Sequence, residues 1–295
     1  MKKITALFLV CVFALTLVVA CGDTEGTSSS TPEPTNTPTS TPESGNTPQS
    51  SFDNTREITV ISRESGSGTR GAFVELTGVE VSVDGTTTDN TSPEAVIGNS
   101  TNAVMTNVAG DSFAIGYIST GSVNDTIKAV SIDGVEPTAA NVLAGSYKIA
   151  RPFIIVTMDE LSPVAEDFIN FIMSRQGQEI VADRYIPIEQ NASGFESNRA
   201  SGTVVVGGST SVSPVMEMLA EAYREINSSA VVEVHATGSG AGINGTIDGV
   251  LDIGMSSRDI RDSEMESLYQ QVTIAMDGIA IIVNNNNPVS NLTME

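Results

Sequence analysis

The sequence predicts an α/β protein built on largely parallel sheets. From residue 56 onward, short β-branched runs alternate with stretches whose apolar residues recur at helical spacing. This alternation is typical of parallel strands joined by helices. The chain has 295 residues, of which 40% are hydrophobic. That content is enough for one large domain or two medium domains.

Seven apolar runs are the expected strands: 58–62, 114–118, 128–132, 153–157, 203–207, 230–234 and 274–283. Ser162-Pro163 and Ser213-Pro214 are typical helix starts, because Ser caps exposed N–H groups and Pro fits the first turn. Apolar residues after Pro214 fall on one helical face as far as Ile226. Residues 189–201 are almost wholly polar and are an expected internal joint.

The N-terminal residues are predicted to export and anchor the chain. Lys2 and Lys3 precede an apolar run, 4–19, that is short for a membrane-spanning helix. The run ends at Ala20-Cys21, which resembles the lipobox of bacterial lipoproteins. We therefore expect residues 1–20 to be removed as a signal and Cys21 to carry lipid. The protein would then be held on the outer face of the bacterial cell membrane by this anchor alone.

Residues 21–55 are predicted to be a tether between this anchor and the fold. They are rich in Ser, Thr and Pro and contain one large apolar side chain, Phe52. Such a stretch buries too little surface to offset the entropy of ordering it.

Composition narrows the possible functions. Lys and Arg number 14 against 36 Asp and Glu, a net charge of −22, which argues against a nucleic-acid partner. There is one His and no Trp, and the two Cys fall in or beside the signal. Zinc, thiol and most other catalytic constellations cannot be assembled from this set. We expect no metal and no cofactor.

Three places share one local design, in which an apolar strand leads through a turn of Gly, Ser and Thr into a helix. The turns lie within residues 66–73, 207–214 and 237–242. Helix N-termini present unpaired N–H groups and partial positive charge, and glycine lets a ligand approach the backbone. No Gly-Lys-Ser/Thr nucleotide loop is present. The three turns together predict a cradle for an oxyanion.

These loops give the chain a family resemblance. Residues 62–73, 207–214, 237–242 and 251–258 resemble the anion-binding loops of the phosphate-binding proteins that serve phosphate ABC transporters. The likeness covers nearly all of the chain from residue 56 onward. It implies a monomeric periplasmic-binding-protein type II fold with two lobes, inorganic phosphate bound in the cleft between them, and delivery to the transporter's permease subunits. It also implies binding without catalysis.

The two pieces of the fold are exchanged relative to most of that family. There, the piece like residues 202–295 comes first, so this chain resembles a circular permutant joined through residues 189–201. One expected lobe is 56–150 completed by 279–295, and the other is 151–278. Segments near 151–153 and 275–282 would cross between them as a hinge. Most relatives continue beyond the equivalent of residue 293, so the end is expected to be shortened or to close its lobe differently.

The resemblance also implies the binding residues. One lobe would hold the anion through Thr210, Ser211 and Ser239, with Asp252 beside it, and the other through Arg63, Ser67, Gly68 and Thr69. A carboxylate next to an anion repels it unless the ligand brings a proton to share. Asp252 is therefore expected to favour protonated phosphate over other oxyanions such as sulfate or molybdate.

Two other functions remain open from the residues alone. A secreted hydrolase could use Ser67, Ser211 or Ser239, but His235 is the only His available as a base, and no Gly-x-Ser-x-Gly elbow occurs. A sensor or adhesive surface protein could keep the binding fold without a transport role.

Overall fold

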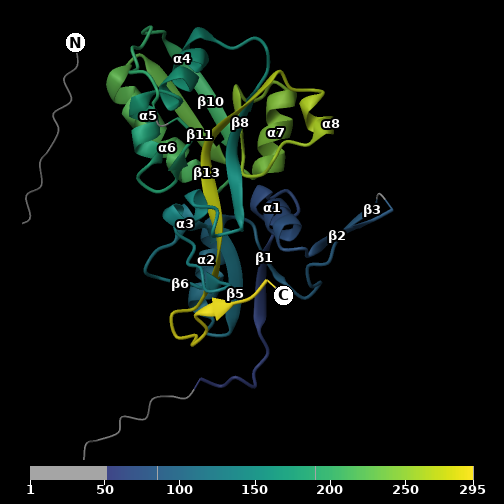
Figure 1. Ribbon diagram of the computed structural model, residues 1–295. Helices are drawn as coiled ribbons and strands as arrows, with labels where there is room; N and C mark the ends of the chain where they lie inside the picture. The colour runs from purple at the N-terminus through teal and green to yellow at the C-terminus, as the bar shows by residue number, and fades with distance from the viewer. Residues whose placement is uncertain (1–51, 85, 190, 295) are drawn as a thin grey trace, which may run out of the picture. The chain divides into compact units, whose positions relative to one another are not determined.

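The computed structural model describes residues 52–84, 86–189 and 191–294, which belong to one compact unit (Figure 1). The predicted signal, Cys21 and the tether as far as residue 51 lie outside the described residues. The folded part begins before residue 56, contrary to the predicted boundary. The Phe52 ring centroid lies 4.8 Å from that of Phe113, and the Arg56 guanidinium lies 4.5 Å from the same ring centroid.

The main sheet confirms the predicted fold class. Its strands follow the order β11 (Ala230–Ala236), β10 (Gly202–Gly208), β12 (Ile253–Ser256), β8 (Ala150–Thr157), β13 (Gln270–Val283), β5 (Ala114–Ser119), β1 (Thr59–Arg63) and β4 (Val96–Gly98). The strands at each end of this order pair in parallel, β11, β10 and β12 at one end and β5, β1 and β4 at the other. Between them, β8 and β13 run antiparallel to each other and to their outer neighbours. Figure 1 shows these two long strands side by side.

Shorter strands complete the sheets. They are β2 (Glu80–Val83), β3 (Thr86–Asp89), β6 (Lys128–Ala129), β7 (Ser131–Ile132), β9 (Ile186–Pro187) and β14 (Asn291–Leu292). The predicted strand 128–132 is divided, because Val130 N donates to Ile281 O whereas Ser131 N turns to Ser290 O. Strands β2, β3, β4 and β12 were not predicted; each has three or four residues, too few for a clear alternating pattern.

The helices are α1 (Gly68–Leu76), α2 (Thr101–Gly110), α3 (Ala139–Leu143), α4 (Pro163–Ile172), α5 (Arg175–Val181), α6 (Ser213–Ile226), α7 (Ser239–Ile247) and α8 (Asp262–Met265), with a 3₁₀ turn, η1, at Thr120–Ser122. Among the described residues, none of these helices combines the length and apolar character needed to cross a membrane.

One predicted helix start is confirmed and one is shifted. Ser162 caps α4, with its side chain accepting from Ala165 N and with Pro163 in the first turn. In α6, however, Ser213 already lies inside the helix, and Val212 is the capping position. The Ser209 hydroxyl instead holds the turn before the helix, because it accepts from Ser211 N and Val212 N at 3.2 and 3.4 Å.

The buried apolar residues fall into two sets along the chain. Two clusters draw on residues 153–185, 204–230 and 243–275, and two others draw on residues 61–149 and 279–282 together with Ile186. The first set packs α4, α5 and α6 against the β10 end of the sheet, and the second packs α2 against the β5 end. The change from one set to the other occurs along β8 and β13.

Tyr223, in the first set of buried residues, is expected to make the stability of the fold depend on alkaline pH. Its hydroxyl donates to Asp167 Oδ2 at 2.7 Å, and burial raises the pKa of Tyr223 to about 12. Because a phenol in the unfolded chain has a pKa near 10, stability from the protonated phenol is fully present below about pH 10 and is lost as pH rises toward about 12. We expect Tyr223→Phe to reduce the fall in melting temperature across this interval, measured by circular dichroism. An identical fall in both proteins would contradict this assignment.

Candidate functional site

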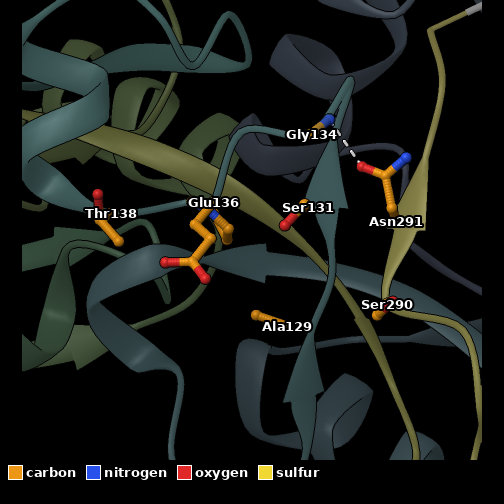
Figure 2. Close-up of a pocket in the computed structure, with 8 residues that line it drawn as sticks. Ala129, Ser131, Gly134, Glu136, Thr138, Ser290 and Asn291 are labelled. Atoms are coloured by element: carbon orange, nitrogen blue, oxygen red, sulfur yellow. Dashed lines mark hydrogen bonds between the residues drawn. The ribbon is translucent and has the colours of Figure 1, made fainter.

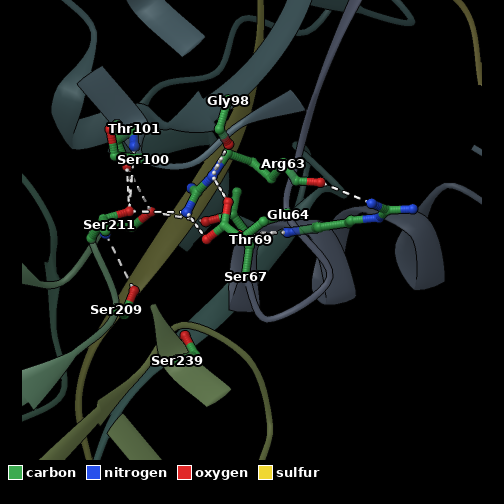
Figure 3. A network of polar contacts seen from close by, with 12 residues as sticks. Arg63, Glu64, Ser67, Thr69, Gly98, Ser100, Thr101, Ser209, Ser211 and Ser239 are labelled. Atoms are coloured by element: carbon green, nitrogen blue, oxygen red, sulfur yellow. Dashed lines mark hydrogen bonds and ion pairs between the residues drawn. The ribbon is translucent and has the colours of Figure 1, made fainter. Parts of the chain in front are cut away.

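Strand ends and helix starts from separate parts of the chain meet around Arg63 (Figure 3). Strands β10, β11 and β12 contribute the segments that begin at Ser209, Thr237 and Ser257. Strand β1 leads into α1, and β4 leads into α2. Within each parallel group the carboxyl ends of the strands share one edge, and ligands of open α/β sheets bind outside such ends. The two groups run in opposite directions, so their carboxyl ends approach the site from opposite sides. The predicted convergence of separate loops is therefore present in the structure.

Arg63 is the central cation of this site. It ends β1 and is only 2% exposed. Its Nε donates to Gly98 O at 3.1 Å, and its Nη2 donates to Thr210 Oγ1 at 3.1 Å. The adjacent Glu64 carboxylate accepts from both Nε and Nη2, at 2.9 and 2.8 Å. This two-point pairing fixes the plane of the guanidinium group.

A cluster of hydroxyl groups lies beside the guanidinium. Thr69 Oγ1 and Ser211 Oγ are 2.9 Å apart. Thr101 Oγ1 lies 3.2 Å from Thr210 Oγ1 and 3.3 Å from Ser211 Oγ, and Thr101 N donates to Thr210 Oγ1. All four residues are buried. Each hydroxyl can turn its hydrogen toward an acceptor, so the cluster can donate several hydrogen bonds to one small anion.

Three serines form the adjoining wall. Ser209 Oγ donates to Ser257 Oγ at 2.8 Å, and Ser257 N donates to Ser239 Oγ at 3.2 Å. Gly68, the first residue of α1, lies against them so closely that a Cβ at that position would be 2.3 Å from Ser239 Oγ. Gly240 N donates to Gly66 O at 3.0 Å. The segments that begin α1 and α7 are therefore in direct contact.

Ser67 supports this wall from α1. Its side chain caps the helix by accepting from Arg70 N at 3.3 Å, and its own N–H donates to Glu64 O. Arg70 in turn donates from Nη1 to Arg63 O at 2.8 Å. Ser67 and Arg70 thus hold the turn that carries Arg63 and Glu64.

Of the predicted site residues, seven meet in this cluster: Arg63, Ser67, Gly68, Thr69, Thr210, Ser211 and Ser239. Asp252 does not join them. Its Oδ2 accepts from Val205 N at 2.7 Å, and its N–H donates to Val205 O at 2.9 Å. Asp252 directly precedes β12, whereas Ser257 directly follows it. Because β12 runs parallel to β10, the end of β12 that carries Ser257 lies beside the end of β10 that leads into the site. The predicted acceptor role of Asp252 is therefore contradicted by its position.

Four residues of the site were not predicted from the sequence: Glu64, Thr101, Ser209 and Ser257. Ser209 and Ser257 each directly follow a strand, which is the position that the three recognised turns share. Thr101 follows Ser100, which caps α2 by accepting from Ala103 N, so a Ser cap in the sequence could have predicted the start of α2. The strand before it, β4, is too short to be recognised as the strand of a strand-turn-helix pattern.

His235 is poorly placed to serve these serines as a base. Its ring is about half exposed, and its Nε2 lies 3.8 Å from Glu233 Oε2. Ser211 and Ser239 are fully buried, and their hydrogen bonds in the described part of the chain run to other hydroxyl groups and backbone amides. This geometry does not favour the hydrolase alternative.

A surface pocket of about 480 Å³ lies elsewhere, beside β6, β7 and β14 (Figure 2). Its lining includes Ser131, Thr138 and Asn291, and its charged residue is Glu136. A carboxylate without a cation repels an anion. The Arg63 cluster is therefore the stronger candidate for an anion site.

Comparison with known proteins agrees with this geometry. The chain matches the PBP superfamily domain over residues 45–176 and 193–295. Phosphate-binding protein PstS 2 of Streptococcus agalactiae is 44% identical over 247 residues, which make up 83% of this chain and 84% of that protein. PstS 2 of Streptococcus pneumoniae is 46% identical over 238 residues, 80% of this chain and 81% of that one.

A solved structure extends the likeness to three dimensions. The crystal structure of a phosphate-binding protein of a phosphate ABC transporter from Streptococcus pneumoniae superposes with a TM-score of 0.63. It is 46% identical, and the match covers 80% of this chain and 92% of that one. With a domain match over most of its length and relatives of this identity, the chain belongs to the PBP superfamily, among its PstS-like phosphate-binding proteins.

Proposed function

We propose that this protein captures inorganic phosphate and delivers it to the permease of an ABC importer. The observation that carries the proposal is the buried Arg63 guanidinium, which donates to the hydroxyl group of Thr210 in the turn before α6. A guanidinium group, hydroxyls and helix N-termini are the donors that proteins use for phosphate. The relatives named above as phosphate-binding proteins support this choice of oxyanion.

The net charge of −22 does not oppose an anionic ligand. Donors about 3 Å from the ligand act inside a buried site, whereas surface carboxylates act through solvent that screens them over roughly 8 to 10 Å. Although Glu64 offsets part of the charge of Arg63, the local guanidinium, hydroxyl and N–H donors together outweigh the distant acidic surface.

Glu64 replaces Asp252 in our account of selectivity. It is the carboxylate that contacts Arg63, and Gly238 lies near its Oε1. A carboxylate at the site can accept a hydrogen bond from HPO₄²⁻ or H₂PO₄⁻ but has nothing to accept from sulfate, which carries no proton near neutral pH. Selection against sulfate would then come from repulsion that only a protonated ligand relieves.

The two sets of core residues support a cleft that closes on the ligand. Residues 56–150 with 279–295 would form one lobe and 151–278 the other, with β8 and β13 as the crossing strands. Contacts from both sides to one anion would stabilise the closed form. We further propose that a lipid on Cys21 holds this extracytoplasmic protein at the membrane. The circular permutation, in which the two pieces joined through residues 189–201 are exchanged relative to most of the family, stays a prediction.

Isothermal titration calorimetry with phosphate and with sulfate tests this function. We expect saturable binding of phosphate and negligible heat from sulfate. Absence of phosphate binding would overturn the proposed function. Equal affinity for the two ions would leave an oxyanion site but remove the selective role of Glu64, and Glu64→Gln would then leave the phosphate-to-sulfate ratio unchanged.

A further inference from the structure

An ion pair between Arg151 and Asp277 is buried where β8 and β13 lie side by side. Asp277 pairs with Arg151 in the strand register, and Arg151 Nη2 lies 3.2 Å from Asp277 Oδ2. Their side chains are 1% and 0% exposed. Burial alone lowers the pKa of Arg151 and raises that of Asp277, and their mutual attraction opposes both changes. A buried pair of this kind adds little net stability over apolar residues, so its presence calls for another explanation.

The contacts of the pair lead to the anion site on one side. Arg151 Nη1 donates to Ser257 O at 3.0 Å. Ser257 is the residue whose hydroxyl and N–H meet Ser209 and Ser239 in the wall of the site. Arg151 therefore contacts the site that we assign to the ligand through one residue, Ser257.

The contacts on the other side lead toward Arg63. Asp277 Oδ1 accepts from Ser119 Oγ and Thr120 Oγ1, both at 2.9 Å. Ser119 ends β5, and Tyr117 in the same strand accepts from Arg63 N and shares a hydrogen bond with Ser62. The ion pair therefore lies within a chain of hydrogen bonds and strand residues that joins the Ser257 side of the site to the Arg63 side.

We propose that Arg151, held by Asp277, is a positioning residue that fixes the Ser257 segment in the arrangement that binds the anion. A guanidinium group can span both partners at once, because its donors point in fixed, divergent directions. Asp277 keeps the guanidinium oriented and ties it to β5. The identity of the ligand rests on the proposed function, whereas the positioning of Ser257 does not.

The test uses a double variant, Arg151→Gln/Asp277→Asn, which removes both charges together and leaves no unpaired ion. Its matched control is Arg175→Gln/Glu179→Gln, an ion pair on α5 whose side chains are 60% and 65% exposed. Amide hydrogen exchange of residues 254–258 is measured without ligand, and phosphate affinity is measured by calorimetry. We expect faster exchange in this segment and roughly five- to tenfold weaker phosphate binding, with both properties unchanged in the control.

Arg151→Lys separates positioning from charge and remains available if the double variant does not fold. It keeps the positive charge beside Asp277 but lacks the fork that reaches Ser257 O, so exchange and affinity should change as in the double variant. Unchanged exchange in residues 254–258 overturns the proposal, even if affinity falls. If the unmodified protein does not bind phosphate, the proposed function fails, and the exchange measurement still decides the role of Arg151.

Discussion

Replacing Arg63 with Ala is expected to weaken phosphate binding by roughly 10- to 150-fold. The guanidinium group is the buried cation of the site and donates to Thr210 Oγ1 at its centre. A hydrogen bond to a charged group contributes about 1.5 to 3 kcal/mol, and every 1.4 kcal/mol is about a factor of ten in affinity. Removal also leaves the Glu64 carboxylate beside the ligand without its partner, which adds repulsion.

Calorimetry on the purified variant measures this loss, and Arg175→Ala is the control for removing one positive charge. Arg175 lies on α5 and is largely exposed. Its loss should change phosphate affinity little, because exposed charges are screened by salt. An Arg63→Ala protein that keeps the affinity of the unmodified protein would remove Arg63 from the site. Melting temperatures of both variants show whether the fold is retained.

The strands could be predicted from the sequence wherever an apolar run was long enough to show a regular spacing. The cores of β8, β10, β11 and β13 were predicted from such runs, although β13 begins at Gln270, earlier than the predicted residue 274. The hairpin of β2 and β3 was not, because its residues are mostly exposed and polar and carry no inward face. Strand boundaries also depend on pairing with distant strands, which the local pattern does not contain. Val130 and Ser131 lie in one apolar run but donate to different partners, so the run divides into two strands.

The site was predictable in its loops but not in all of its residues. Gly and hydroxyl residues at helix starts identified the turns within 66–73, 207–214 and 237–242, because the chemistry of a helix N-terminus is local. The individual residues Arg63, Thr210 and Ser239 were implied by the family resemblance. Asp252 and Ser257 lie in the segment 251–258, which the resemblance identified, and only the direction of β12 beside β10 determines which of them reaches the site. The pairing of Arg63 with Glu64 likewise depends on side-chain placement that spacing does not encode.

Gly68→Ala is expected to weaken phosphate binding to a similar degree while leaving the fold intact. A methyl group there would lie 2.3 Å from Ser239 Oγ and 2.9 Å from Ser239 Cβ, and Ser239 is fully buried. Since Ser239 Oγ also accepts from Ser257 N, it cannot move aside without disturbing the serine wall. Overpacking of this kind costs about 1 to 3 kcal/mol, or roughly 5- to 150-fold in affinity if it falls on the closed form.

Gly66→Ala is the matched control in the same loop. Gly66 is exposed, and a Cβ built on it meets nothing within 4 Å, so the substitution adds the same methyl group without a clash. The contrast between the two glycines tests whether the segments before α1 and α7 must touch for the ligand to be held. If α1 and α7 bound phosphate independently, separating them would cost little, and Gly68→Ala would bind as tightly as Gly66→Ala. A large difference in affinity at equal melting temperature would instead locate the cost in closure around the ligand rather than in either core.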